Sequence, residues 1–267
     1  MWCRPLSVAG ALLLPLGAGA ADVASPHALE YDLTLDATVM GAAATAALLL
    51  GAYRPKLAAP RCRWCQPDSF DASVRKALVW DDNPGLANTT SSVLANAVLP
   101  ASMSLYLLLS AGAAGDVVAG VNDVLAVAEA SILAVVVNEG VKDLAGRARP
   151  YDYYGAPPGA PPGGQSLSFY SGHTSFAFSV VTATVTIASM RGYGDATRVA
   201  TVGLAAAAAV GYFRVAADQH YLTDVLAGAA VGGLVGFAVP WLLHLPGRGR
   251  REPGAIEAAP GGIAIAF

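Results

Sequence analysis

Six long apolar runs constrain this chain more than any other feature of its sequence. They are Leu33–Tyr53, Ser92–Ala111, Val117–Val141, Gly172–Met190, Val199–Phe213 and Leu222–Leu243. About 20 apolar residues cross the hydrocarbon core of a bilayer as a helix. The composition agrees, since 55% of the 267 residues are hydrophobic and 13% are charged, against about 25% charged in soluble domains. We expect an all-α polytopic membrane bundle of five to six apolar helices, because the Ala- and Thr-rich first run is the weakest.

The two ends of the chain differ from this pattern. Residues 1–20 have the form of a secretory signal peptide, in which Arg4 precedes an apolar stretch and residues 18–20 (AGA) match a cleavage site. We expect cleavage there, and the alternative is an uncleaved anchor. The Arg- and Gly-rich residues 245–267 predict a disordered tail.

Residues 21–90 form an N-terminal region with the weak apolar run and a polar stretch. Within it, the apolar spacing of residues 71–80 predicts a helix along the membrane interface. Cys62 and Cys65 (CRWC) make one C-x-x-C pair, which is half of a zinc site. A disulfide formed in an oxidising compartment is the preferred interpretation. A redox-active pair is the alternative, although no thioredoxin-like βαβ pattern surrounds it.

Basic residues in short connections predict the orientation of the helices. Arg191 and Arg198 flank the connection between the fourth and fifth runs, and Arg248–Arg251 follow the last run. Both places are expected in the cytoplasm. If the signal is cleaved, the first run must pack without crossing for the polar clusters described below to lie outside. An uncleaved signal that does not span the membrane is the alternative.

Three polar clusters stand at the ends of the apolar runs. The first, residues 142–150 (KDLAGRARP), contains Lys142 and Arg149, about two helical turns apart. Both are expected to face one way, on a helix that ends at Pro150. Two cations at a helix exit can hold a dianion. The alternative is a pair of positive anchors at the membrane interface.

The second cluster is Ser171-Gly172-His173, at the start of an apolar run. Serine is a preferred helix N-cap, and the free N–H groups of the first turn can bind phosphate. Gly172 lets the backbone approach an anion closely, and His173 projects from the first turn. The alternative is an ordinary cap followed by an interfacial histidine.

The third cluster is residues 214–224 (RVAADQHYLTD). Asp224 follows His220 by four residues, so in a helical turn the carboxylate is expected to contact the imidazole. Such a contact fixes the tautomer and leaves the other ring nitrogen nucleophilic. Arg214 adds a forked donor for phosphate oxygens. The alternative is a structural His–Asp pair at a membrane surface.

Taken together, K-x6-RP, SGH and R-x5-H-x3-D resemble the motifs of the type 2 phosphatidic acid phosphatase (PAP2) superfamily, which also includes vanadium haloperoxidases. The resemblance covers about residues 91–244. It implies a PAP2 phosphatase domain there, in which His220 attacks phosphorus, Asp224 orients His220 and His173 protonates the leaving group. Phosphate oxygens would be held by the remaining motif residues: Lys142, Arg149, Ser171, Gly172 and Arg214.

Two positions depart from the family pattern. Tyr170 stands where proline is usual, and Phe213 stands where serine is usual. Neither side chain carries the chemistry, although Phe213 removes a supporting hydrogen bond. Among polar residues inside the third run, Glu129 is expected to be structural, and Glu139 is expected to pair with Lys142 or Arg147. His27 and His244 are too isolated to complete a zinc site.

The resemblance predicts a metal-independent phosphatase of the bacterial inner membrane, with its site facing the periplasm and no cofactor. Its substrate would be a lipid phosphate or diphosphate, and Tyr151, Tyr153 and Tyr154 of the Pro- and Gly-rich loop 151–169 would bear on selectivity. The alternatives are a vanadium-dependent haloperoxidase and a catalytically weak membrane scaffold. The net charge of −3, without a basic stripe of interleaved aromatics, argues against a nucleic-acid partner.

Overall fold

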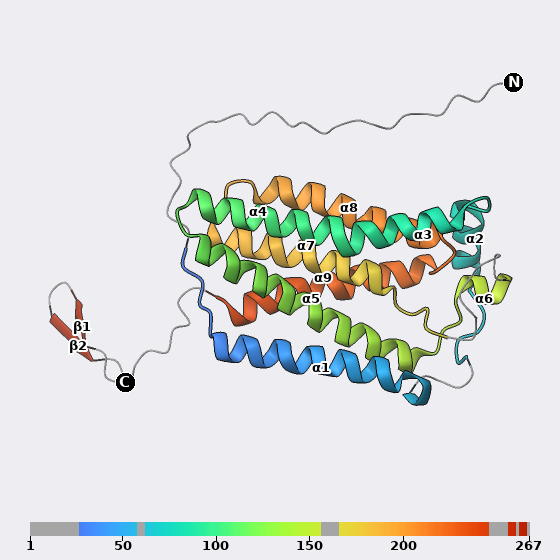
Figure 1. The fold of residues 1–267 in the computed structure, drawn as a ribbon, viewed down its shortest axis with the longest axis horizontal. Helices are drawn as coiled ribbons and strands as arrows, with labels where there is room; N and C mark the ends of the chain where they lie inside the picture. Colours follow the sequence, from blue (N-terminus) through green and yellow to red (C-terminus); the bar gives the residue numbers. More distant parts are fainter. Residues whose placement is uncertain (1–26, 58–61, 156–165, 246–255, 260–261, 266–267) are drawn as a thin grey trace, which may run out of the picture.

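The computed structural model describes residues 27–57, 62–155, 166–245, 256–259 and 262–265. Its main body is a bundle of helices that lie side by side along one long axis (Figure 1). Within these described ranges, six segments are long and apolar enough to cross a membrane. They are α1 (Leu33–Leu57), the series α3, η1 and α4 (Pro84–Ala113), α5 (Val117–Ala145), α7 (Gly172–Arg191), α8 (Ala196–Ala216) and α9 (Leu222–Leu243). Each contains most or all of one predicted run, so the expected all-α membrane bundle is confirmed.

The second spanning segment is three helical pieces in series. They are α3 (Pro84–Val93), a π-helical turn η1 (Leu94–Val98) and α4 (Leu99–Ala113). The Asn83 side chain caps its start by accepting from the Leu86 N–H at 3.0 Å. Pro100 has no N–H to donate, and the wider turn just before it accommodates that loss. The helix therefore begins eight residues before the predicted apolar run, which started at Ser92.

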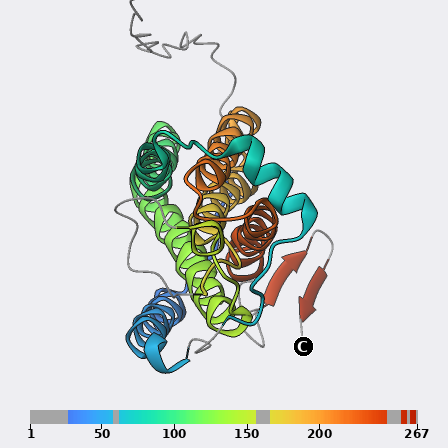
Figure 2. The ribbon, with the colours of Figure 1, turned by 90° about the vertical axis from the view of Figure 1, so that its right-hand side faces the viewer.

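Helix α7 lies inside the bundle, with α4, α5, α8 and α9 packed around it (Figure 2). The apolar core between these helices includes Leu107, Val181, Ile187 and Val210, all fully or almost fully buried. A row of glycines on α9 faces α7. A Cβ at Gly228 would lie 2.6 Å from the Ser171 carbonyl oxygen, and Gly232 and Gly236 are tighter still. Glycine is required along this row because it lets the two backbones touch.

Two short helices lie at one end of the bundle, α2 (Ser69–Leu78) and α6 (Pro150–Tyr154) (Figures 1 and 2). Helix α2 corresponds to the helix predicted over residues 71–80, and Asp68 caps it by accepting from the Asp71 N–H at 2.9 Å. The end of the bundle that carries α2 and α6 is also the end where α5 finishes and where α7 and α9 begin.

The prediction that one helix runs from Lys142 to Pro150 is wrong. Helix α5 stops at Ala145, because Gly146 takes a left-handed conformation (φ 59°) and its N–H donates to the Lys142 carbonyl at 3.3 Å. This is a common glycine helix stop. Pro150 instead begins α6, where its missing N–H costs nothing. Lys142 and Arg149 therefore come from different elements.

Helix α1 packs along α5 and runs the same way through the bundle (Figure 1). Its length matches a full crossing, which differs from the expectation that residues 33–53 pack without crossing if the signal is cleaved. At the end where α1 begins, Arg191 is 5% exposed and donates to Asp123 at 2.8 Å. Of the two arginines used to predict orientation there, only Arg198 is thus solvent-accessible.

Several other predictions concern residues outside the described ranges. These are the signal peptide at residues 1–20, the arginines of residues 248–251 and most of the internal Pro-rich loop. Within the tail predicted to be disordered, the structure contains two short strands, β1 (Ile256–Ala259) and β2 (Gly262–Ile265). They pair antiparallel, with Ile256 opposite Ile265. Pro260 and Gly261 separate them in the sequence, a composition typical of turns.

Candidate active site

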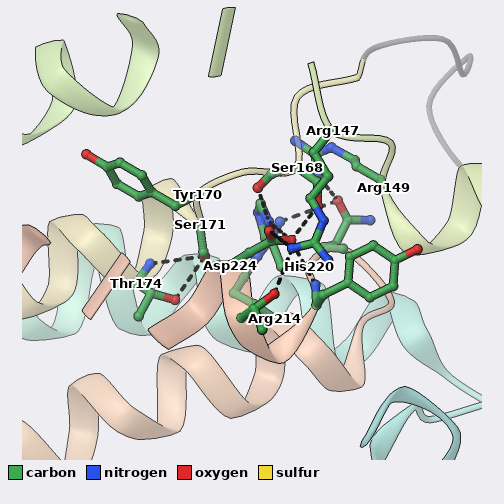
Figure 3. A network of polar contacts seen from close by, with 12 residues as sticks. Arg147, Arg149, Ser168, Tyr170, Ser171, Thr174, Arg214, His220 and Asp224 are labelled. Atoms are coloured by element: carbon green, nitrogen blue, oxygen red, sulfur yellow. Dashed lines mark hydrogen bonds and ion pairs between the residues drawn. The ribbon is translucent and has the colours of Figure 1, made fainter. Parts of the chain in front are cut away.

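The three predicted clusters meet at the end of the bundle that carries α2 and α6 (Figure 3). Lys142 lies in the last turn of α5, and His173 lies in the first turn of α7. Arg214 lies in the last turn of α8, and His220 lies in the connection to α9. Elements far apart in sequence thus bring the predicted residues to one place.

His220 is 2% exposed, and the contact it makes fixes its tautomer. Its Nδ1 lies 2.8 Å from the carbonyl oxygen of Ser168. A carbonyl can only accept, so Nδ1 carries the proton and Nε2 carries the lone pair. Within the described part of the chain, Nε2 makes no hydrogen bond. The imidazole therefore presents an unprotonated nitrogen.

The expected direct contact between Asp224 and His220 is not present as a hydrogen bond. Asp224 Oδ2 lies 3.7 Å from His220 Nδ1, beyond hydrogen-bonding range. It accepts instead from Ser168 Oγ at 2.6 Å and from the Tyr221 N–H at 2.9 Å. Because Tyr221 adopts an extended conformation before α9 begins, the two residues are not a full helical turn apart. Asp224 therefore fixes Ser168, and the carbonyl of Ser168 in turn accepts from His220 Nδ1.

Arg147 connects Asp224 to the N-terminal region, a role that the sequence does not indicate. Its Nη1 donates to Asp224 Oδ1 and its Nη2 donates to Asp71 Oδ2, both at 2.6 Å. The guanidinium is 1% exposed and lies between the rings of Trp64 and Tyr221, at 3.7 and 4.4 Å from their centroids. Glu139, predicted to pair with Lys142 or with this arginine, lies 3.5 Å from Lys142 and also contacts Arg54.

Asp71, on α2, is fully buried below this arginine. Besides Arg147, it accepts from the Thr223 N–H at 3.0 Å and from Thr223 Oγ1 at 2.5 Å. Two buried carboxylates thus share one guanidinium, and Arg147 Nε has no hydrogen-bond partner among the described residues. Helix α2 is thereby fixed to the start of α9.

The Cys62–Cys65 pair forms a disulfide, as the sequence favours. The loop it closes carries Trp64, whose ring covers Arg147. Backbone bonds attach this loop to the segment after α5, with the Ala148 N–H donating to the Trp64 carbonyl at 3.1 Å. The disulfide loop therefore forms one wall around Arg147.

Two cations flank His220 and share one amide. Arg149 donates to Gln219 Oε1 at 2.7 Å, and Arg214 approaches the same oxygen at 3.4 Å. Arg214 also donates to Asn88 Oδ1 on α3 at 2.6 Å. Burial, followed by the charges of Arg149, Arg214 and Lys142, holds the pKa of His220 well below its ordinary value. His220 is therefore neutral at physiological pH.

The predicted N-cap at Ser171 is confirmed. Its Oγ accepts from the Thr174 N–H at 3.5 Å, and its own N–H donates to the Asp224 carbonyl at 3.0 Å. Gly172 is needed next to it, because a Cβ there would lie 2.6 Å from Asn138 Oδ1 and 3.0 Å from Lys142 Nζ. The lysine thus reaches the start of α7.

His173 contacts the second spanning segment. Its Nε2 lies 3.3 Å from Ser92 Oγ, and that hydroxyl lies 2.9 Å from the Asn88 carbonyl, to which it donates. With its one hydrogen used, Ser92 is an acceptor toward the imidazole, which places a proton on His173 Nε2. Asn88, Ser92 and Gln219 are residues that the sequence does not single out.

The two positions that depart from the family pattern lie in packed surroundings. The Tyr170 side chain is buried, and its carbonyl accepts from Asn138 Nδ2 at 2.8 Å. Phe213 packs edge-on against Trp80, with ring centroids 5.7 Å apart. The aromatic ring at 213 contributes to packing against the segment that links α2 to α3.

A bundle of six membrane-length helices, with a buried histidine among cations at one end, defines a multi-pass membrane protein with a polar site. Residues 123–247, which include all of the predicted site residues, match the model of the PAP2 superfamily. The likeness to the PAP2 superfamily extends over this segment, which is 125 of the 267 residues.

One similar solved structure is a transmembrane PAP2-type phosphatidylglycerolphosphate phosphatase from Bacillus subtilis. The two chains are 19% identical with a TM-score of 0.46, and the alignment covers 76% of this chain and 93% of the other. No curated protein matches the sequence.

Proposed function

We propose that this protein is a phosphatase that hydrolyses a lipid phosphate or diphosphate through a phosphohistidine, without a metal at the reacting phosphate. One observation carries the proposal: His220 Nε2 is unprotonated and has no hydrogen-bond partner among the described residues, while Nδ1–H donates to the Ser168 carbonyl. A neutral imidazole fixed by its other nitrogen is suited to nucleophilic attack.

In the first step, the lone pair of His220 Nε2 forms a bond to phosphorus as the bond to the leaving oxygen breaks. His173, protonated on both ring nitrogens once the negative charge of the phosphate lies beside it, gives its Nε2 proton to that oxygen and becomes neutral. The phosphorylated imidazole is positively charged, and the Ser168 carbonyl stabilises it through Nδ1–H. In the second step, water attacks phosphorus, His173 takes its proton and His220 is released, which reverses the acid and base roles.

Positive side chains hold the three non-bridging oxygens in this scheme. Lys142, Arg149 and Arg214 act on His220 electrostatically, and Ser171 with the Gly172 N–H lies at the start of α7. Phosphoryl transfer needs mainly positioning and charge stabilisation. Arg149 and Arg214 both contact the amide oxygen of Gln219. On substrate binding, phosphate oxygens would replace that oxygen as their partner.

A lipid substrate fits a site at the end of a membrane bundle. Candidates are phosphatidic acid, phosphatidylglycerol phosphate, undecaprenyl diphosphate and lipid A phosphate. Next to the site, a cavity of 440 Å³ is lined by residues that include Tyr153, Asp152 and Ser166. We infer that this cavity and the tyrosines of α6 contact the headgroup and contribute to selectivity.

The experiment is phosphate release in detergent from a panel of these lipids and a water-soluble phosphomonoester, with EDTA present. We expect turnover of one or more lipids to survive chelation and to be inhibited by vanadate. Loss of turnover in EDTA with recovery in Mg²⁺ would contradict the metal-free proposal. Oxidation of bromide by hydrogen peroxide in the presence of the vanadate-loaded protein, without phosphatase activity, would favour a haloperoxidase.

We further propose that the site faces the periplasm of the bacterial inner membrane. The support is Arg198 at the opposite end of the bundle, together with the basic stretch that follows α9. Because α1 runs parallel to α5, an outer site requires α1 to begin in the cytoplasm if it spans. Reporter fusions at residues 162 and 251 should report opposite compartments, and a cytoplasmic residue 162 would overturn the assignment.

A further inference from the structure

A second buried polar cluster lies at the other end of the bundle, away from His220. Glu129 on α5 and His244 just after α9 are each 1% exposed. His244 Nε2 lies 3.2 Å from Glu129 Oε2. Neither residue belongs to the proposed phosphatase site, and sequence reasoning treats both as structural or isolated.

The tautomer of His244 makes this contact informative. Its Nδ1 lies 3.0 Å from the Glu30 carbonyl oxygen, so Nδ1 is the donor there. In a neutral imidazole, Nε2 then has only a lone pair, and it faces a carboxylate oxygen that also only accepts. A cation must lie between them, either a proton or a metal ion. A ring N–H bonded to a backbone carbonyl is the usual support of a metal-binding histidine.

A third possible ligand comes from α1. A carboxylate oxygen of Asp36 lies within 4.8 Å of the ligand atoms of both Glu129 and His244. Asp36 and Glu129 line the same cavity, of 180 Å³, between α1 and α5. Glu129 Oε1 is buried and has no hydrogen-bond partner among the described residues. An unpaired buried carboxylate oxygen is costly unless a cation neutralises it.

We propose that Asp36, Glu129 and His244 bind a divalent transition-metal ion of the Zn²⁺ class, with water from the cavity as a further ligand. Histidine nitrogen and carboxylate oxygen are both zinc ligands. Ligands at about 2.0–2.2 Å around a tetrahedral ion lie about 3.3–3.6 Å apart, slightly more than the observed 3.2 Å separation. The same separation lies at the long end of the range of N–H···O hydrogen bonds, about 2.7–3.2 Å.

The consequence of such a site is a link among three helices. Helix α1 packs mainly on α5, and the metal would tie its first turn to α5 and to the end of α9. The ion would hold α1 in place and would take no part in turnover, since the site lies at the opposite end from His220. The inference does not depend on the phosphatase proposal.

The test is Zn²⁺ binding to the metal-stripped, tag-free full-length protein in detergent, followed by calorimetry and by metal analysis after gel filtration. We expect one ion per chain and a higher thermal midpoint with Zn²⁺. Asp36→Asn and His244→Gln should each weaken binding at least tenfold. His27→Gln and Asp195→Asn, at the same end but outside the cluster, should bind as the wild type does.

Three results would overturn the proposal. They are no stoichiometric binding, binding unchanged in both cluster variants, or loss in the His244 variant alone. The first would leave a proton between His244 and Glu129 as the explanation. Both cluster variants should keep their hydrolytic activity under saturating Zn²⁺. His220→Ala should bind Zn²⁺ normally, which separates this site from the phosphatase site.

Discussion

Arg147 Nη1 lies 2.6 Å from Asp224 Oδ1, and the same guanidinium lies 2.6 Å from Asp71. These contacts join α9, which follows the proposed nucleophile His220, to α2 in the N-terminal third of the chain. Both carboxylates are fully buried, so neither has water as a substitute partner. Arg147 is thus the only described side chain that bonds both acids.

We expect Arg147→Lys to lower kcat about tenfold or more with little change in KM. A lysine keeps the charge, but its compact ammonium cannot replace a planar fork that donates to two carboxylates. Arg147→Gln should also destabilise the fold, by about 3–5 kcal/mol for a broken buried pair. Steady-state kinetics and thermal unfolding in detergent measure both effects.

Arg149→Lys is the matched comparison, since Arg149 is proposed to contact the phosphate. It should raise KM more than Arg147→Lys does. A double-mutant cycle of Arg147→Gln with Asp224→Asn should be strongly non-additive. Additive losses would show that the contact contributes nothing to turnover.

His220→Ala should reduce hydrolysis by at least about a thousandfold while the protein remains folded, because the proposed nucleophile is removed. Asp224→Asn should cost less, on the order of 10- to 100-fold, since Asp224 positions His220 through Ser168. Acid-labile ³²P labelling of the wild type, absent from His220→Ala, gives a direct readout. A His220→Ala protein with near-normal turnover would refute the assignment.

Gly232→Ala should lower the thermal midpoint and the activity together. A methyl group there would overlap the Ser175 backbone on α7, and separating α7 from α9 would displace Ser171. Gly233→Ala is the control one residue away, where a Cβ would lie 3.8 Å from Thr182 Cγ2 in ordinary contact. We expect that variant to be neutral or slightly more stable, because alanine favours helix. Equal effects in both variants would rule out the packing explanation.

The buried His220 predicts a pH dependence of stability. Its pKa in the folded protein is well below its ordinary value, through burial and the nearby arginines. Below about pH 6.5, the unfolded chain binds a proton that the folded chain does not. Stability from this group is therefore complete above that pH and falls as the pH decreases, by up to about 1.4 kcal/mol per pH unit.

Thermal midpoints measured from pH 8 to pH 5 should fall more steeply for the wild type than for His220→Gln, whose side chain does not titrate. The difference between the two curves isolates this histidine from other groups. Parallel curves would mean that His220 titrates alike in both states.

The sequence predicts the membrane helices well, because apolar length is a local property. It also predicts which residues gather at the site, since the motifs lie at helix ends that converge. It fails where one residue changes the path of the chain. Gly146 ends α5, so Lys142 and Arg149 do not lie on one face of one helix, as their seven-residue spacing had predicted.

It fails also for contacts between distant segments. Asp71 and Arg147 are 76 residues apart, and nothing in a single sequence indicates that they pair. The same holds for Asn88 and Gln219, which look like ordinary polar residues until Arg214 is placed beside them.

The pairing of Asp71 with Arg147 also determines which fragments of the chain can form an intact site. The segment matched by the family model begins at residue 123, but one of the two carboxylates to which Arg147 donates comes from α2. A fragment that begins after α2 would contain every motif residue and would leave Arg147 Nη2 without its Asp71 partner. We therefore expect the end of the bundle that carries the proposed site to be complete only with α2 in place.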